Sequence, residues 1–196
     1  MSRLPANRAA AAVAVPELVL GVDPTATGTG AAELSRRSGS VAWWTWTAVA
    51  AGWRVRSSCA PEVVVPSLDY AVSHVGGEVA RILDTSVGVV VEGLHVPPKW
   101  AKRAKGEDVL KLAEAAGLTI AALVRAGLPA PFARPSAKEW RAPFGLAACD
   151  YERAEALAIE MAMNEGWLPR GLTAKEQGAV AEAGRMGRWA RIGVVT

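Results

Sequence analysis

Two acidic residues in this sequence stand where carboxylates could do chemistry. Asp23 ends the apolar run LVLGV (18–22) and is followed by proline, threonine and glycine, and Glu92 ends the apolar run VGVVV (87–91) and also precedes a glycine. If both runs are parallel strands, their carboxyl ends meet at one edge of a sheet. Because a buried carboxylate must be paired or bind a metal, these two acids require a cation.

A third acid, Glu182, lies in the segment AVAEAG, whose small residues would let a helix approach a sheet end closely. One Asp and two Glu side chains would form an all-oxygen site that suits Mg²⁺ or Mn²⁺ and not zinc. Paired metals about 3.5 to 4 Å apart promote phosphoryl chemistry by lowering the pKa of an attacking water. The alternative is that Asp23 caps a turn and Glu182 is solvated, and spacing alone does not separate these two interpretations.

The elements that must position these acids follow a pattern typical of an α/β domain. SRRSGS is a hairpin turn, Thr173 with Glu176 forms a capping box, and the tryptophans of WWTWT (43–47) are interpreted as strand packing rather than base stacking. A mixed central sheet flanked by helices is expected. The expected strands are 18–22, 28–34, 41–49, 87–91 and 131–134, and the expected helices are 68–84, 107–129 with Gly127 and Pro129 as its stop, 150–166 and 173–192.

Composition agrees with one domain of this kind. The 196 residues are 51% hydrophobic, which allows one sizeable core, and we expect one α/β domain at 16–192 after a flexible arm at 1–15. Pro16 and Glu17 interrupt the alanine-rich start before it reaches the length of a signal peptide. Cys59 and Cys149 have no zinc spacing, and no apolar run approaches 20 residues, so we expect a soluble cytoplasmic protein.

A basic segment at 96–108 is expected to be an exposed loop. The net charge of +3 permits a polyanionic partner but does not require one. Trp100 could stack on a base while the surrounding cations hold phosphates, and the alternative is a solvated charge run; those cations are Lys99, Lys102, Arg103 and Lys105. His74 and His95 are interpreted as packing or loop residues and not as metal ligands.

Five segments in this order resemble the RuvC family of Holliday junction resolvases, across about residues 17–190. They are LGVDPTATGTG, VVVEGLHV, LKLAEAAGLTIAALVRAGLP, ARPSAKEWRAPFG and AVAEAGRMG. The resemblance implies an RNase H-like fold and a homodimer that cuts two strands of a four-way DNA junction symmetrically. It also implies Mg²⁺ as cofactor with Mn²⁺ as a substitute, 5′-phosphate and 3′-hydroxyl ends, and a branch-migration helicase as a partner.

The resemblance also implies roles for particular residues. Asp23 matches the first-strand metal ligand, Glu92 the second-strand acid, and Glu182 the last helical acid, which is normally an aspartate. Lys138 falls where the family places a basic residue near the scissile phosphate, a source of transition-state charge stabilisation. The expected DNA-binding residues are Arg134, Lys138 and Arg141 together with Lys99, Trp100, Lys102, Arg103 and Lys105.

The chain departs from the family pattern at two places. Ala179 stands where the family usually has an Asp or a His, so water, Gln177 or a more distant acid would have to complete a second metal site. Leu94 and His95 stand where some members have an aromatic residue that wedges into the junction, and Trp100 could replace it.

Three other functions compete with junction resolution. An actin-like or sugar-kinase ATP site would need a second phosphate loop, which this chain does not contain. A junction-binding protein that does not cut would be consistent with Ala179. An RNase H-like nuclease acting on forks, flaps or RNA–DNA hybrids would differ only in its loops.

Overall fold

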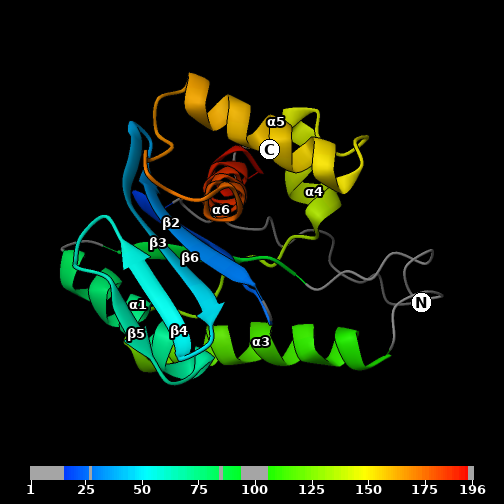
Figure 1. Ribbon diagram of the computed structural model, residues 1–196. Coiled ribbons are helices and arrows are strands. Elements are labelled where there is room, and N and C mark those ends of the chain that lie inside the picture. Colours follow the sequence, from blue (N-terminus) through cyan, green and yellow to red (C-terminus); the bar gives the residue numbers. More distant parts are fainter. Residues whose placement is uncertain (1–15, 27, 84–85, 94–105, 194–196) are drawn as a thin grey trace, which may run out of the picture.

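The protein folds into one six-stranded sheet with helices on both faces (Figure 1). The computed structural model describes residues 16–26, 28–83, 86–93 and 106–193. The strand order is β5-β4-β3-β2-β1-β6, which confirms the expected mixed sheet. The strands are β1 (Leu18–Asp23), β2 (Thr29–Arg36), β3 (Gly39–Val49), β4 (Gly52–Ser57), β5 (Val63–Val65) and β6 (Val87–Val91).

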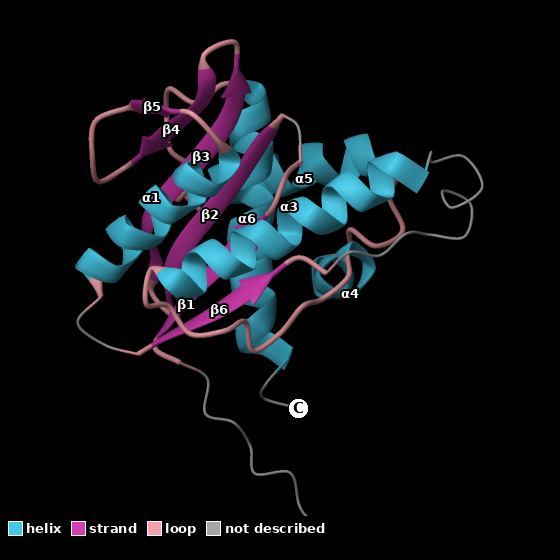
Figure 2. Cartoon of the chain, turned by 90° about the horizontal axis from the view of Figure 1, so that it is seen from below, coloured by secondary structure: helices cyan, strands magenta, loops and turns pink. Residues whose placement is uncertain are grey.

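Two helices cover one face of the sheet and the remaining helices cover the other. On the first face, α1 (Leu68–Ile82) packs beside α3 (Gly106–Arg125), as Figure 2 shows from below. On the second face, α6 (Ala174–Gly193) lies directly on β1 and β2, and it is flanked by α5 (Tyr151–Asn164) and by α4 (Ala137–Arg141). A 3-10 turn, η1 (Ala142–Phe144), follows α4. No helix among the described residues combines the length and apolar character that crossing a bilayer requires.

The register of β1 against β6 brings the first two acids to one sheet edge. The strands pair in parallel from Leu18 with Val87 to Val22 with Val91, and the Glu92 N–H donates to the Val22 carbonyl at 3.0 Å. Asp23 and Glu92 therefore leave the sheet side by side, which confirms the expectation from the two apolar runs.

The tryptophans of β3 pack in the core, as expected. Trp44 and Trp46 are fully buried on the side of the sheet that α1 covers, and Trp44 Nε1 donates a 2.7 Å hydrogen bond to Glu78 Oε2. Trp43 points to the opposite face and packs, partly buried, with the α6 cluster. A tryptophan with no exposed surface cannot stack on a base.

The close packing of α6 on β1 depends on small residues. A Cβ added at Gly21 would lie 2.0 Å from the Ala183 carbonyl oxygen and 2.8 Å from the Gly187 nitrogen. Because neither backbone atom can rotate away, only glycine at position 21 permits this crossing. Glu182 is the residue next to Ala183, so the crossing sets its distance from Asp23.

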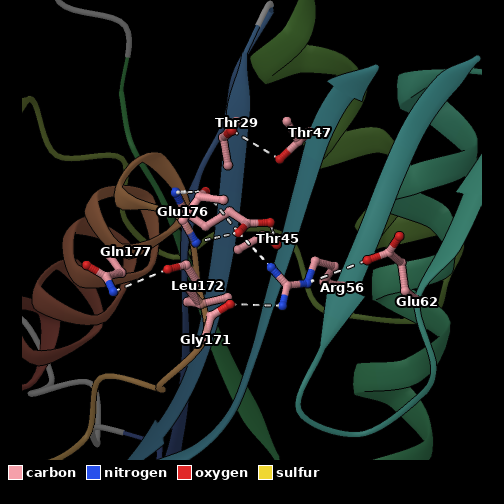
Figure 3. Close-up of polar contacts among 10 residues, drawn as sticks. Thr29, Thr45, Thr47, Arg56, Glu62, Gly171, Leu172, Glu176 and Gln177 are labelled. Carbon is pink, nitrogen blue, oxygen red and sulfur yellow. Dashed lines mark hydrogen bonds and ion pairs between the residues drawn. The ribbon is translucent and has the colours of Figure 1, made fainter. Parts of the chain in front are cut away.

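A capping box begins α6, as predicted, and it is tied to the sheet. Glu176 accepts from the Thr173 N–H at 2.9 Å, and the Glu176 N–H donates to Thr173 Oγ1 at 3.3 Å. The Glu176 carboxylate also pairs with Arg56 Nη1 of β4 at 2.8 Å (Figure 3). This partly buried pair anchors the start of the helix that carries Glu182.

Four short segments differ from the sequence-based expectation. Strands β4 and β5 were not predicted, because β5 has only three residues and only Val55 of β4 is buried, so neither gives a clear strand signal. Helix α4 was not predicted either, since five residues are too few for a periodic signal. The expected strand at 131–134 is wrong, because this segment forms only one parallel bridge, Ala133 with Val90. Its flanking prolines, Pro131 and Pro135, have no N–H to donate to a ladder.

Candidate active site

Asp23 and Glu92 form a hydrogen-bonded carboxyl pair at the ends of β1 and β6. Burial raises the pKa of Asp23 well above its usual value, and the charges of Glu92 and Glu182 raise it further. Burial also raises the pKa of Glu92, against the hydrogen bond from Trp140 and the charge of Arg141. Ionising both of two contacting carboxyl groups has a large free-energy cost, so the pair retains a proton when no metal is bound.

Glu182 reaches the same place from α6 and is held by an arginine. Its side chain is buried, and Oε1 accepts a hydrogen bond from Nη2 of Arg141 in an ion pair. Burial raises the pKa of Glu182 to about 7; the charge of Arg141 lowers it and the charge of Glu92 raises it. Glu182 is close enough for its charge to raise the pKa of Asp23, so the third predicted acid lies near the other two.

The structure buries Arg141, although the sequence suggested a DNA-binding role for it. Arg141 is 9% exposed, and its guanidinium lies over the rings of Trp140 and Tyr151, 5.0 and 5.3 Å from their centroids. Trp140 Nε1 also donates a 3.3 Å hydrogen bond to Glu92 Oε1. The contact between Arg141 and DNA stays a prediction; in this structure the guanidinium lies between the rings of α4 and α5, paired with Glu182.

A cavity of about 330 Å³ opens beside Glu182. Its walls come from α6, α5 and the turn between β1 and β2, and its lining residues are Thr25, Gly28, Thr29, Tyr151, Glu155, Lys175, Ala179 and Glu182. The Glu155 side chain reaches the cavity by packing against Gly178 of α6, where an added Cβ would lie 2.0 Å from Glu155 Oε1. Glu155 and Tyr151 were not among the predicted site residues. Their helix was interpreted only as a packing element, and neighbouring residues in the sequence do not indicate that it lies over α6.

The donor set fits a divalent cation at the Asp23–Glu92 pair. Both groups offer hard oxygen ligands, and their mutual repulsion is relieved by a positive charge. Within the described residues, no three Asp, Glu, His or Cys side chains are grouped closely enough to hold a metal ion as they lie. The third acid is instead engaged by Arg141.

The other predicted residues lie around this centre or outside the described chain. Lys138 is exposed in the first turn of α4, and Arg134 is exposed beside Gly93. Gln177, a suggested substitute ligand, donates instead to the Leu172 carbonyl at 3.3 Å (Figure 3). The predictions for Leu94, His95, Lys99, Trp100, Lys102, Arg103 and Lys105 lie outside the described residues, as does the arm at 1–15.

His74 and the two cysteines are remote from this chemistry. His74 Nε2 contacts Glu78 Oε1 at 3.0 Å on α1, on the opposite face of the sheet, which agrees with a packing role. Cys59 and Cys149 are free thiols.

The fold and the positions of the acids define an RNase H-like architecture. Two solved structures of RuvC from Thermus thermophilus resemble this chain, and one of them is described as a complex with a Holliday junction substrate. They are 19% and 17% identical to the chain, cover 90% and 91% of it and 97% of their own length, and both have a TM-score of 0.51. No family model matches the chain, and neither does any curated protein. The likeness to RuvC confirms the predicted fold.

Proposed function

We propose that this protein is a structure-selective endonuclease that resolves four-way DNA junctions by metal-dependent phosphodiester hydrolysis. The observation that supports this most is the meeting of Asp23, Glu92 and Glu182 at one sheet edge, on a fold shared with RuvC along nearly its whole length. Three carboxylates from two strands and a helix, one buried and two partly buried, have no structural need to be close together. A cation that acts on a phosphodiester explains their placement.

Each residue has a distinct task in this proposal. Asp23 and Glu92 would hold Mg²⁺, with Mn²⁺ as a substitute, and Glu182 completes the acidic wall. The cation, when bound, supplies Lewis-acid polarisation of a phosphodiester and favours 5′-phosphate products. Trp140 orients Glu92 through its indole N–H. Lys138 is exposed on α4, two residues before Trp140, and would contact the scissile phosphate.

A homodimer would match the symmetry of the proposed substrate. Helix α3 presents large apolar side chains outward, and these are Leu110, Leu112, Leu118 and Val124, with exposed fractions of 65%, 38%, 44% and 44%. A second copy packed on the side of α3 that carries Leu110, Leu118 and Val124 would bury these three side chains and place two sites about a two-fold axis. Sedimentation of wild type and Leu110→Glu tests this, with a dimer expected only for the wild type. The proposal also implies a cytoplasmic location and a branch-migration helicase as partner.

The nuclease assay compares a labelled four-way junction, a fork and a linear duplex in Mg²⁺, Mn²⁺ or EDTA. Paired symmetric nicks in the junction are expected, and EDTA, Asp23→Asn and Glu92→Gln should abolish them. Glu62→Gln is the matched control, because Glu62 is an exposed residue that pairs with Arg56 at 3.7 Å and not with the three acids. Its cleavage should equal that of the wild type.

Two outcomes would replace the proposal. Tight junction binding without nicks would make this a junction-binding protein on a nuclease fold. Faster cutting of the fork than of the junction would make it a nuclease for forks or flaps.

A further inference from the structure

We infer that the Arg141 guanidinium is a permanent positive charge in the acidic site. It neutralises Glu182 and leaves the Asp23–Glu92 pair as the position for a single divalent ion. This inference rests on the proposed metal-dependent function and specifies how many ions the site takes. Arg141 acts in it as a positioning residue, because it contacts a carboxylate and not the substrate.

The surroundings of Arg141 hold the guanidinium in place. The rings of Trp140 and Tyr151 lie 5.0 and 5.3 Å from it, and cation–π contacts of this kind are strongest where water is excluded. Its Nε is buried and has no hydrogen-bond partner among the described residues. These contacts hold the positive charge of Arg141 next to the acids in the folded protein.

The guanidinium acts on all three acids and not only on its ion-pair partner. Its charge lowers the pKa of Asp23, Glu92 and Glu182, against the burial that raises each of them. Fully ionised, three carboxylates and one guanidinium carry a net charge of about minus two, which a single divalent ion cancels. A second divalent ion would leave the buried site with about two excess positive charges.

The wall beside Glu182 supplies no carboxylate from the neighbouring turn of α6. Ala179 lines the cavity there, and it has no ligand atom to offer. The other charged groups of that cavity are Lys175 and Glu155, and the charge of Glu155 raises the pKa of Glu182. Both the ion pair at Glu182 and the alanine at 179 therefore favour one metal position over two.

Metal stoichiometry tests this inference without reference to cleavage. Mn²⁺ binding, measured by electron paramagnetic resonance and calorimetry, should give one ion per wild-type protomer. Arg141→Gln should bind a second ion, because Glu182 is then free, and Arg141→Lys should restore one ion. A purely structural role for Arg141 would change the melting temperature and leave the stoichiometry at one.

Glu182→Gln keeps the test decisive if the Arg141 variants do not fold. Since Glu182 is not a direct ligand in this arrangement, the variant should still bind one Mn²⁺, with Kd changed by no more than about 10-fold. Loss of stoichiometric binding in Glu182→Gln, or two ions in the wild type, would overturn the inference, and metal-dependent junction cleavage by the wild type would leave the proposed function standing. A wild type that binds no Mn²⁺ would refute both this inference and the proposed function.

Discussion

Substituting Gly21 with alanine should separate α6 from β1 and displace Glu182 from the other acids. The new Cβ would lie 2.0 Å from the Ala183 carbonyl oxygen, whereas favourable contacts begin near 3.5 Å, so the helix must move by roughly 1.5 Å. Overpacking of this kind costs about 1–3 kcal/mol. We expect about 3 kcal/mol of unfolding free energy to be lost, because both clashing atoms belong to the backbone.

The displacement should affect catalysis as well as stability. Glu182 adjoins Ala183, and a misplacement of about 1 Å at a reacting centre costs on the order of 100-fold in rate. Urea unfolding gives the change in stability, and junction cleavage in Mg²⁺, measured where the variant is fully folded, gives the change in rate.

Gly77→Ala is the matched control for this substitution. Nothing lies within 4 Å of a Cβ built at Gly77 on α1. Alanine there should therefore raise stability by about 0.5–1 kcal/mol and leave cleavage unchanged. If Gly21→Ala kept its unfolding free energy within about 0.5 kcal/mol and its cleavage rate near that of the wild type, the contact between α6 and β1 would not be what positions Glu182.

Three further predictions follow from the buried polar groups. The pKa of Glu182 is raised to about 7, so its protonated carboxyl stabilises the metal-free fold at low pH and this stabilisation is lost as the pH rises through 7. Mn²⁺ should therefore raise the melting temperature more at pH 8 than at pH 6. A larger rise at pH 6 would contradict this prediction. Trp44→Phe removes the 2.7 Å donor to buried Glu78 and should cost about 1–3 kcal/mol in urea unfolding, whereas an unchanged midpoint would show that the hydrogen bond adds nothing. Arg56→Gln removes the cation that pairs with Glu176 at 2.8 Å and should lower the free energy of unfolding by about 2 kcal/mol at pH 7. The loss should be smaller at pH 4, because the pKa of Glu176 is lowered in the folded protein and the stabilisation disappears as the carboxylate is protonated. Equal losses at both pH values would refute the assignment.

The elements next to the chemistry were predictable because their signals are local. The runs before Asp23 and Glu92 are apolar throughout, as buried parallel strands require, and each ends at its acid. The small residues around Glu182 indicated close helix packing, which the contact between Gly21 and Ala183 bears out. In contrast, β5 is a three-residue strand at the edge of the sheet, and the neighbouring β4 has only one buried residue, so their sequences give a weak strand signal.

The amino-acid sequence by itself determined which acids meet, since strand ends and a small-residue helix are encoded in neighbouring residues. Only the tertiary structure decided what else surrounds them. Arg141 is a cation in a mixed segment, and nothing near it in sequence distinguishes a surface contact from a buried partner of Glu182. Glu155 reaches the cavity only because α5 crosses α6 at Gly178. Charges brought together by packing between distant elements leave no periodic pattern, so their pairing appears only when the chain is folded.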